Sequence, residues 1–194
     1  MYSRYIKKFL DVIFSFSLII ILLPIMICIG IAIKIDSPGP IFFKQNRIGK
    51  DKKMFTIFKF RTMKVETPSN VPTHLFNDSL SYITRVGKFL RVTSLDELPQ
   101  LFNIFLGHMS FIGPRPALWN QYDLIEKREA CSVNKILPGL TGLAQINGRD
   151  ELDIDTKVSF DSVYAQKITF LGDLKILFMT IIKVFIREGI KETK

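Results

Sequence analysis

The stretch VIFSFSLIIILLPIMICIGIAI, residues 12–33, decides the fold class, because it contains no charged side chain. A helix rises about 1.5 Å per residue, so this segment is long enough to cross the hydrocarbon core of a bilayer. A cleaved signal peptide fits less well, since its apolar part is shorter and residues 34–40 offer no small-residue cleavage site. We therefore expect a membrane segment that stays attached to the rest of the chain.

Two features of this segment favour a re-entrant hairpin over a simple crossing. Pro24 lies near its middle, where it removes a backbone donor and clashes with the Ile20 carbonyl. Lysine and arginine side chains flank both ends, and such cations prefer the cytoplasmic side of a membrane. A spanning helix stays the ordinary alternative. Our hypothesis is that the segment bends at Pro24 and returns to the face from which it entered.

Composition restricts the possible partners of the remaining chain. Lysine and arginine total 27 against 18 acidic residues, and the formal charge of +9 calls for an anionic partner. A mean hydropathy of +0.22 is unusual for a soluble nucleic-acid binder, and no nucleic-acid-binding motif occurs. We therefore expect lipid headgroups or a phosphorylated substrate and no nucleic acid. Cys28 and Cys131 form no CxxC, so we expect neither a disulfide framework nor a zinc site.

The most informative polar stretch is TSLDELPQLFN, residues 93–103. Ser94 and Glu97 fit a capping box, but Pro99 would clash inside a helix that starts after Ser94. We therefore expect the helix to begin at Asp96 or later, with its N-terminus keeping both carboxylates ionised. An ionised carboxylate can attack phosphorus, while its neighbour can hold a divalent cation against diphosphate oxygens. Asp96 and Glu97 are the candidate catalytic residues.

Cations that suit phosphate lie on both sides of this pair. Residues 55–63 alternate in polarity, which predicts a short strand with Lys59 and Arg61 on one face. Arg91 extends a basic stripe on a helix that begins near residue 84. Solvated surface charge is the alternative for these residues.

Arg115 has stronger support, because a proline stands on either side of it. Pro114 and Pro116 restrict the backbone and so fix the direction of the Arg115 side chain before a ligand binds. Such preorganisation suits bidentate hydrogen bonding to phosphate. We therefore include Pro114 and Arg115 among the candidate phosphate-binding residues.

Three further segments are less specific. PGLTGLAQINGR, residues 138–149, is a Gly-rich connector or a loop that binds nucleotide or sugar through Thr141, Gln145, Asn147 and Arg149. Residues 66–81 contain two prolines and many polar side chains, which suggests a mobile lid. Residues 173–187 have helical period and a narrow cationic arc, so we expect an amphipathic helix at the membrane surface.

The chain resembles the small monotopic phosphoglycosyl transferases, bacterial sugar transferases that begin polyprenyl-linked glycan assembly. The resemblance runs from Arg4 to Arg187. Its carriers are GPIFFKQ (39–45) with Arg47 and Gly49, FKFRTM (58–63), Arg91, SLDELPQL (94–101), GPRP (113–116) and PGLTG (138–142).

The resemblance implies an α+β fold, mainly helical. Residues 1–35 would form a re-entrant anchor in the bacterial inner membrane. Residues 36–194 would form a small catalytic domain on the cytoplasmic face, with short strands and interfacial amphipathic helices.

It also implies a reaction and roles for individual residues. Asp96 would attack the sugar-bearing phosphate of a UDP-sugar and release UMP, and undecaprenyl phosphate would then take the phosphosugar in a ping-pong sequence. Glu97 would coordinate Mg²⁺, and Lys59, Arg91 and Arg115 would bind the diphosphate. By family analogy the sugar is an N-acetylated amino sugar, and downstream membrane glycosyltransferases would extend the product into a polysaccharide, capsule or glycoconjugate.

The chain departs from the family pattern at two positions. Leu23 stands where a serine often precedes the proline, and Ile154 where relatives commonly carry tryptophan. Larger relatives add spanning helices and another domain, so we expect this chain to be the minimal catalytic form.

The same acidic pair could serve a metal-dependent membrane phosphohydrolase. A nonenzymatic membrane-bound adaptor would explain the charge and the anchor, but not the acidic pair.

Overall fold

The computed structural model describes residues 2–67, 82–148 and 151–186, and the side chain of Phe185 is not described. The helices are the π-helical η1 (Tyr2–Ile6), α1 (Lys7–Asp36), α3 (Arg85–Thr93), α4 (Gln100–Phe105), α5 (Tyr122–Ala130), α6 (Leu143–Ile146), α7 (Ile154–Gln166) and α8 (Phe170–Ile186), with 3₁₀ turns η2 (Lys50–Lys52), η4 (Leu95–Glu97) and η5 (Val133–Lys135). The strands are β1 (Phe42–Ile48), β2 (Met54–Phe60), β3 (Ser110–Ile112), β4 (Ala117–Leu118) and β5 (Gly139–Thr141). The expected mixed, mainly helical fold is confirmed.

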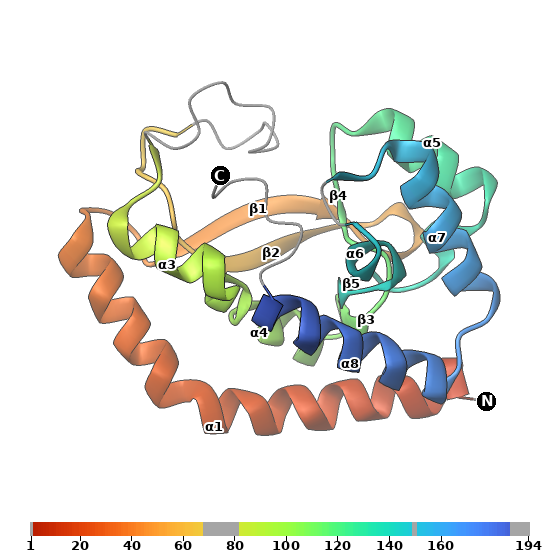
Figure 1. Cartoon of the computed structure of the whole chain (residues 1–194), viewed down its shortest axis with the longest axis horizontal. Coiled ribbons are helices and arrows are strands. Elements are labelled where there is room, and N and C mark those ends of the chain that lie inside the picture. The colour runs from red at the N-terminus through yellow and green to blue at the C-terminus, as the bar shows by residue number, and fades with distance from the viewer. Residues whose placement is uncertain (1, 68–81, 149–150, 187–194) are drawn as a thin grey trace.

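Helix α1 is long and bent, and it lies along one side of the molecule as two arms (Figure 1). Pro24 lies inside it and explains the bend, since proline removes one helical hydrogen bond and its ring crowds the preceding turn. Among the described residues, this is the one helix long and apolar enough to cross a membrane. Its most apolar window is only 17% buried, so it is not the core helix of a soluble domain. The hairpin topology stays a prediction.

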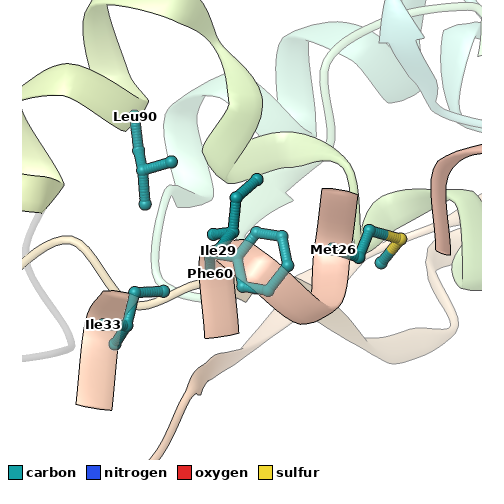
Figure 2. Close-up of a cluster of buried hydrophobic side chains, with 5 residues drawn as sticks. All are labelled: Met26, Ile29, Ile33, Phe60 and Leu90. Carbon is teal, nitrogen blue, oxygen red and sulfur yellow. The ribbon is translucent and has the colours of Figure 1, made fainter. Parts of the chain in front are cut away.

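The two arms of α1 pack on different parts of the core. Before the proline, Leu18 and Leu22 contact the cluster around Ile57, which includes residues of β2 and α4. After the proline, a second cluster joins α1 to β2 and α3; its members, drawn in Figure 2, are Met26, Ile29, Ile33, Phe60 and Leu90. The anchor therefore shares its core with the rest of the chain.

Strands β1 and β2 form an antiparallel hairpin, and β4 pairs with the other edge of β1. Helix α4 is fixed against β2 by Asn103, whose side chain accepts from the Phe58 amide at 2.9 Å and donates to the Thr56 carbonyl at 2.7 Å. The strand expected to reach residue 63 ends at Phe60. The hairpin and α4 together hold the end of β2 beside η4.

Strands β3 and β5 form a separate parallel pair. Gly139 makes this pairing possible, because a Cβ there would collide with the backbone of Gly113. The segments GPRP and PGLTG, which are far apart in the sequence, are therefore held side by side.

Helix α8 runs beside the first arm of α1 (Figure 1). The buried carboxylate of Asp173 joins them, accepting from Lys7 and from the Tyr2 hydroxyl at 2.7 Å each. The outer face of α8 exposes large apolar side chains: Phe170, Leu171, Leu174, Leu177, Phe178 and Ile181. An exposed apolar face agrees with the expected interfacial helix. Arg187 and most of the expected lid, residues 68–81, lie outside the described residues.

Candidate active site

The acidic pair lies on the short turn η4. Ser94 ends helix α3 in the left-handed region, with φ of 57°, and its side chain makes no capping hydrogen bond to the following turn. The capping-box interpretation is therefore wrong. Helix α4 begins at Gln100, immediately after Pro99, which confirms that the helix starts at Asp96 or later. Asp96 and Glu97 thus lie between two helices rather than within one.

Glu97 is the centre of an ion-pair cluster. It is 9% exposed, and its Oε1 accepts from Lys59 Nζ at 2.7 Å and from Arg115 Nη2 at 3.1 Å. The Lys59 side chain is 17% exposed and that of Arg115 is 35% exposed. Water and salt screen such partly buried pairs less than surface pairs, so the attraction between these charges is stronger than at the surface. Two separate segments, carrying Lys59 and Arg115, therefore converge on this carboxylate.

Asp96 is half-buried next to this cluster, and the charges of Lys59, Arg91 and Arg115 all act on it. Burial raises the pKa of Asp96, and the negative charge of Glu97 raises it further, whereas the three cations oppose the shift. A helix N-terminus was expected to favour the ionised form of this carboxylate, whereas the direction of the pKa shift is the opposite. Helix α4 starts too far along the chain, and burial has the larger effect.

The cations of the site are also removed from bulk water. Burial lowers the pKa of Lys59, and the neighbouring Glu97 counteracts this. Burial likewise lowers the pKa of Arg91, whose Nε donates to the Thr62 hydroxyl at 2.8 Å. Arg47, on β1, is close enough to interact with both Arg115 and Glu97. The four cations outnumber the two carboxylates, so the site is suited to a polyanion.

Arg115 is positioned through its backbone. Prolines supply no amide hydrogen, so the segment is held by its carbonyls instead. Three consecutive carbonyls accept hydrogen bonds: Pro114 from the Gly139 amide at 2.8 Å, Arg115 from Arg128 Nη1 at 2.9 Å, and Pro116 from Arg47 Nη1 at 3.1 Å. The guanidinium of Arg115 thus projects from a restrained segment.

Two residues that support this segment escaped the sequence analysis. Arg128 on α5 and Asp161 on α7 form an ion pair at 2.6 Å, with side chains only 7% and 1% exposed. They are separated by 33 positions, and no local pattern indicates that they meet. Arg47 does have a sequence signal, since it belongs to a motif that carries the family resemblance, but it was not among the predicted site residues.

Arg61 lies apart from the acidic pair. It is 5% exposed, and its guanidinium donates to the backbone carbonyls of Ser37 and Pro38, just after α1. Gly39, with φ of 122°, leaves the space that this guanidinium fills. These contacts fix the end of α1 against β2 and give Arg61 a structural position.

The Gly-rich segment is only partly described. Thr141 is buried, and its hydroxyl lies 2.7 Å from that of Thr180 on α8, so it contacts the core. Asn147 is exposed and donates to the Leu143 carbonyl at 2.7 Å. Gln145 has buried amide atoms with no hydrogen-bond partner among the described residues, which is unusual without a ligand. Arg149 lies outside the described residues.

The acidic pair can supply two of the ligands of a Mg²⁺ ion, but not a complete protein cage. Among the described residues, no group of three or more His, Cys, Asp or Glu side chains is close enough to bind a metal ion. Magnesium does not need such a cage, because it is commonly held by one or two carboxylates together with substrate phosphates and water. Glu97 and Asp96 can supply those carboxylates, so the residues present fit a metal that arrives with a diphosphate.

The acidic pair, its surrounding cations and the exposed apolar faces of α1 and α8 are the features of a membrane-associated protein with a site suited to an anion. Residues 2–187 match the family model described as bacterial sugar transferase, and the chain belongs to this family.

Three relatives illustrate its range. The UDP-glucose:undecaprenyl-phosphate glucose-1-phosphate transferase of Escherichia coli (strain K12) is 40% identical over 96% of this chain and 42% of its own length. The undecaprenyl-phosphate galactose phosphotransferase of Salmonella typhimurium is 37% identical, with the same coverage. The exopolysaccharide production protein PSS of Rhizobium leguminosarum bv. phaseoli is 36% identical over 94% of this chain and 96% of its own length. The chain therefore spans less than half of the first two relatives and nearly all of the third.

Proposed function

We propose that this protein transfers a sugar 1-phosphate from a UDP-sugar to undecaprenyl phosphate and releases UMP. The observation that carries the proposal is the position of Asp96, half-buried among Lys59, Arg91 and Arg115 and next to the ion-paired Glu97. Relatives of the same family are named for this reaction. The product would be the first membrane-bound intermediate of a polysaccharide or glycoconjugate.

In the first step, an oxygen of ionised Asp96 attacks the sugar-bearing phosphorus of the UDP-sugar. The bond from this phosphorus to the bridging oxygen breaks, and UMP leaves with the electron pair. Lys59, Arg91 and Arg115 stabilise the negative charge on the diphosphate oxygens. Glu97 would hold Mg²⁺, which when bound reduces the repulsion between the carboxylates and the diphosphate.

In the second step, a phosphate oxygen of undecaprenyl phosphate attacks the phosphorus of the aspartyl phosphosugar. The bond from Asp96 to phosphorus breaks, and the free carboxylate is regenerated. The elevated pKa of Asp96 agrees with this role, because burial makes the carboxylate a stronger nucleophile once it is ionised. The second substrate thus needs the same site as the first, after UMP has left.

The site has to be at a membrane surface, because undecaprenyl phosphate is a lipid. The exposed apolar faces of α1 and α8 support a position in the bilayer interface. We place α1 in the inner membrane as a re-entrant helix bent at Pro24, with the catalytic domain on the cytoplasmic face. Labelling of a cysteine placed at residue 3 with an impermeant reagent tests this topology, since labelling from outside intact cells excludes the hairpin.

The identity of the sugar is a separate proposal. Family analogy led us to expect an N-acetylated amino sugar, whereas two of the relatives are named for glucose and galactose. The unpartnered amide of Gln145 is a candidate contact for the nucleotide or sugar. A panel of UDP-sugars assayed for UMP release identifies the substrate.

The covalent intermediate can be tested by mass spectrometry. Purified protein is mixed with the accepted UDP-sugar without lipid, quenched in acid and weighed intact. We expect wild type to gain the mass of one phosphosugar, Asp96→Asn to gain none, and an exposed control, Asp155→Asn, to behave as wild type. An adduct on Asp96→Asn would refute the assigned nucleophile. Free sugar phosphate without lipid-linked product in the complete reaction would indicate a phosphohydrolase.

A further inference from the structure

Two buried side-chain amides lie on helix α4, and they differ in their hydrogen bonding. Asn103 is fully buried, and its amide is bonded to backbone atoms of Thr56 and Phe58 on β2. Gln100 is only 2% exposed, but its Nε2 has no hydrogen-bond partner among the described residues. Most buried polar groups in folded proteins have a partner, so this exception requires an explanation.

The position of Gln100 is bracketed by two contacts to the end of β2. Glu97, three residues earlier, accepts from the ammonium group of Lys59. Asn103, three residues later, accepts from the amide of Phe58, the neighbour of Lys59 on the strand. The backbone between η4 and α4 stays right-handed, so residues three apart lie on the same side of it. Gln100 therefore lies in the middle of one stripe that faces the end of β2.

The side chain of Gln100 is directed towards the catalytic turn. Side chains on a helix lean towards its N-terminal end, and the turn before α4 is η4, which carries Asp96 and Glu97. Asp96 is four residues before Gln100, the other spacing at which helical side chains meet. An acceptor held between Asp96 and Lys59 would therefore be within reach of the buried Nε2.

We propose that Gln100 is a further catalytic residue, whose Nε2 donates a hydrogen bond to an oxygen of the phosphoryl group that is transferred through Asp96. The proposal rests on the proposed function and adds a neutral donor to the cations of the site. Gln100 neither gives up nor takes a proton, and the oxygen that it contacts keeps its bond to phosphorus. A preorganised amide stabilises the charge that develops on such an oxygen in the transition state.

A purely structural role explains the amide less well. A side chain of similar length without polar atoms would pack at position 100 and leave no donor unbonded. Groups that are locally unfavourable are typical of functional sites, where activity is kept at the expense of stability. The proposal therefore requires that removal of the amide affects stability and activity in different ways.

Gln100→Met tests this requirement, because methionine has a similar length and adapts to buried space. Its urea midpoint in detergent should equal or exceed that of wild type, since no hydrogen bond is lost. The burst of UMP with donor alone should slow by about 100-fold, as expected when one preorganised donor is removed. The KM for UDP-sugar should change little, because the bond acts in the transition state. Gln166→Met, at an exposed position of α7, should leave all three quantities unchanged.

The second half-reaction provides an independent measurement. Protein carrying a radiolabelled phosphosugar is mixed with undecaprenyl phosphate, and the loss of label from the protein is followed. Gln100→Met should slow this step by a similar factor, because the same phosphoryl group is transferred. Asn103→Leu is the contrasting variant for stability. It loses two hydrogen bonds to β2, so its urea midpoint should fall.

Three results would overturn the proposal. The first is a Gln100→Met protein with wild-type burst and transfer rates. The second is a fall in its urea midpoint as large as that of Asn103→Leu, which would show that the amide maintains the fold. The third is a higher KM for UDP-sugar at unchanged kcat, which would show that the amide only binds the donor. If wild type itself gives neither a UMP burst nor lipid-linked product, the proposed function fails and this role fails with it, whereas a burst that Gln100→Met retains refutes the role alone.

Discussion

Replacing Asp161 by Asn should weaken the fold and the active site together. The Asp161 side chain is 1% exposed and accepts from Arg128 at 2.6 and 3.0 Å, so its removal leaves a guanidinium buried without its counter-charge. Breaking a buried pair in this way costs about 3–5 kcal/mol of unfolding free energy. Asp155→Asn is a matched control, because Asp155 pairs with Lys127 on the same two helices but is 79% exposed. It should leave stability almost unchanged.

A double variant separates the structural role of the pair from its effect on Arg115. Replacing a buried ion pair by apolar side chains is often neutral or stabilising, so Arg128→Met with Asp161→Leu should recover most of the lost stability. The Arg115 carbonyl still loses its donor at 2.9 Å, and an unsatisfied buried carbonyl costs about 1–3 kcal/mol. If the segment that carries Arg115 moves to relieve this cost, the active conformation becomes less populated by the same free energy. Turnover should then fall by about 5- to 150-fold.

The assay has two parts, both in detergent. Urea denaturation measures the free energy of unfolding, and steady-state UMP release at saturating donor and acceptor measures kcat. We expect the double variant to be stable but slow. A double variant with wild-type stability and wild-type kcat would refute the idea that Arg128 positions Arg115.

Three further predictions concern individual residues. The rate of UMP release should rise with pH as Asp96 loses its proton, and the midpoint should lie above the pKa of an ordinary aspartate, because burial raises the pKa of Asp96. Arg91→Gln should move this midpoint to higher pH, because the cation that favours the ionised carboxylate is lost. A midpoint at the ordinary aspartate pKa would contradict the assignment. Glu97→Gln should weaken the dependence of activity on Mg²⁺, measured by titration after chelation, and an unchanged magnesium curve would exclude Glu97 as a ligand. Gly39→Ala should destabilise the protein by about 1–3 kcal/mol in urea denaturation, since φ is 122° and its Cβ would meet the Arg61 guanidinium; unchanged stability would contradict this packing.

Local chemistry determined which features could be predicted from the sequence. The bend at Pro24 follows from a missing backbone donor, and the late start of α4 follows from Pro99, so each depends on its own neighbours. The position of Arg61, in contrast, depends on residues that are distant in the sequence. It was grouped with Lys59 by strand alternation, but β2 ends at Phe60 and Arg61 binds the carbonyls that follow α1.

The electrostatic state of the site could not be predicted for the same reason. The sequence places Asp96 near a helix N-terminus, which favours the ionised carboxylate, but α4 begins only at Gln100 and burial raises the pKa of Asp96. The Arg128–Asp161 pair also forms between helices whose packing no local pattern fixes. The roles of Asp96, Glu97 and the surrounding cations stay predictions, although their positions agree with one site.

The most direct test of the covalent scheme is isotope exchange without an acceptor. Purified protein is incubated with unlabelled UDP-sugar and radiolabelled UMP, and the label in UDP-sugar is measured over time. If Asp96 forms a phosphosugar ester reversibly, wild type should move label into UDP-sugar in the complete absence of undecaprenyl phosphate, and Asp96→Asn should not. No exchange by a wild-type preparation that makes lipid-linked sugar when the acceptor is added would contradict the account.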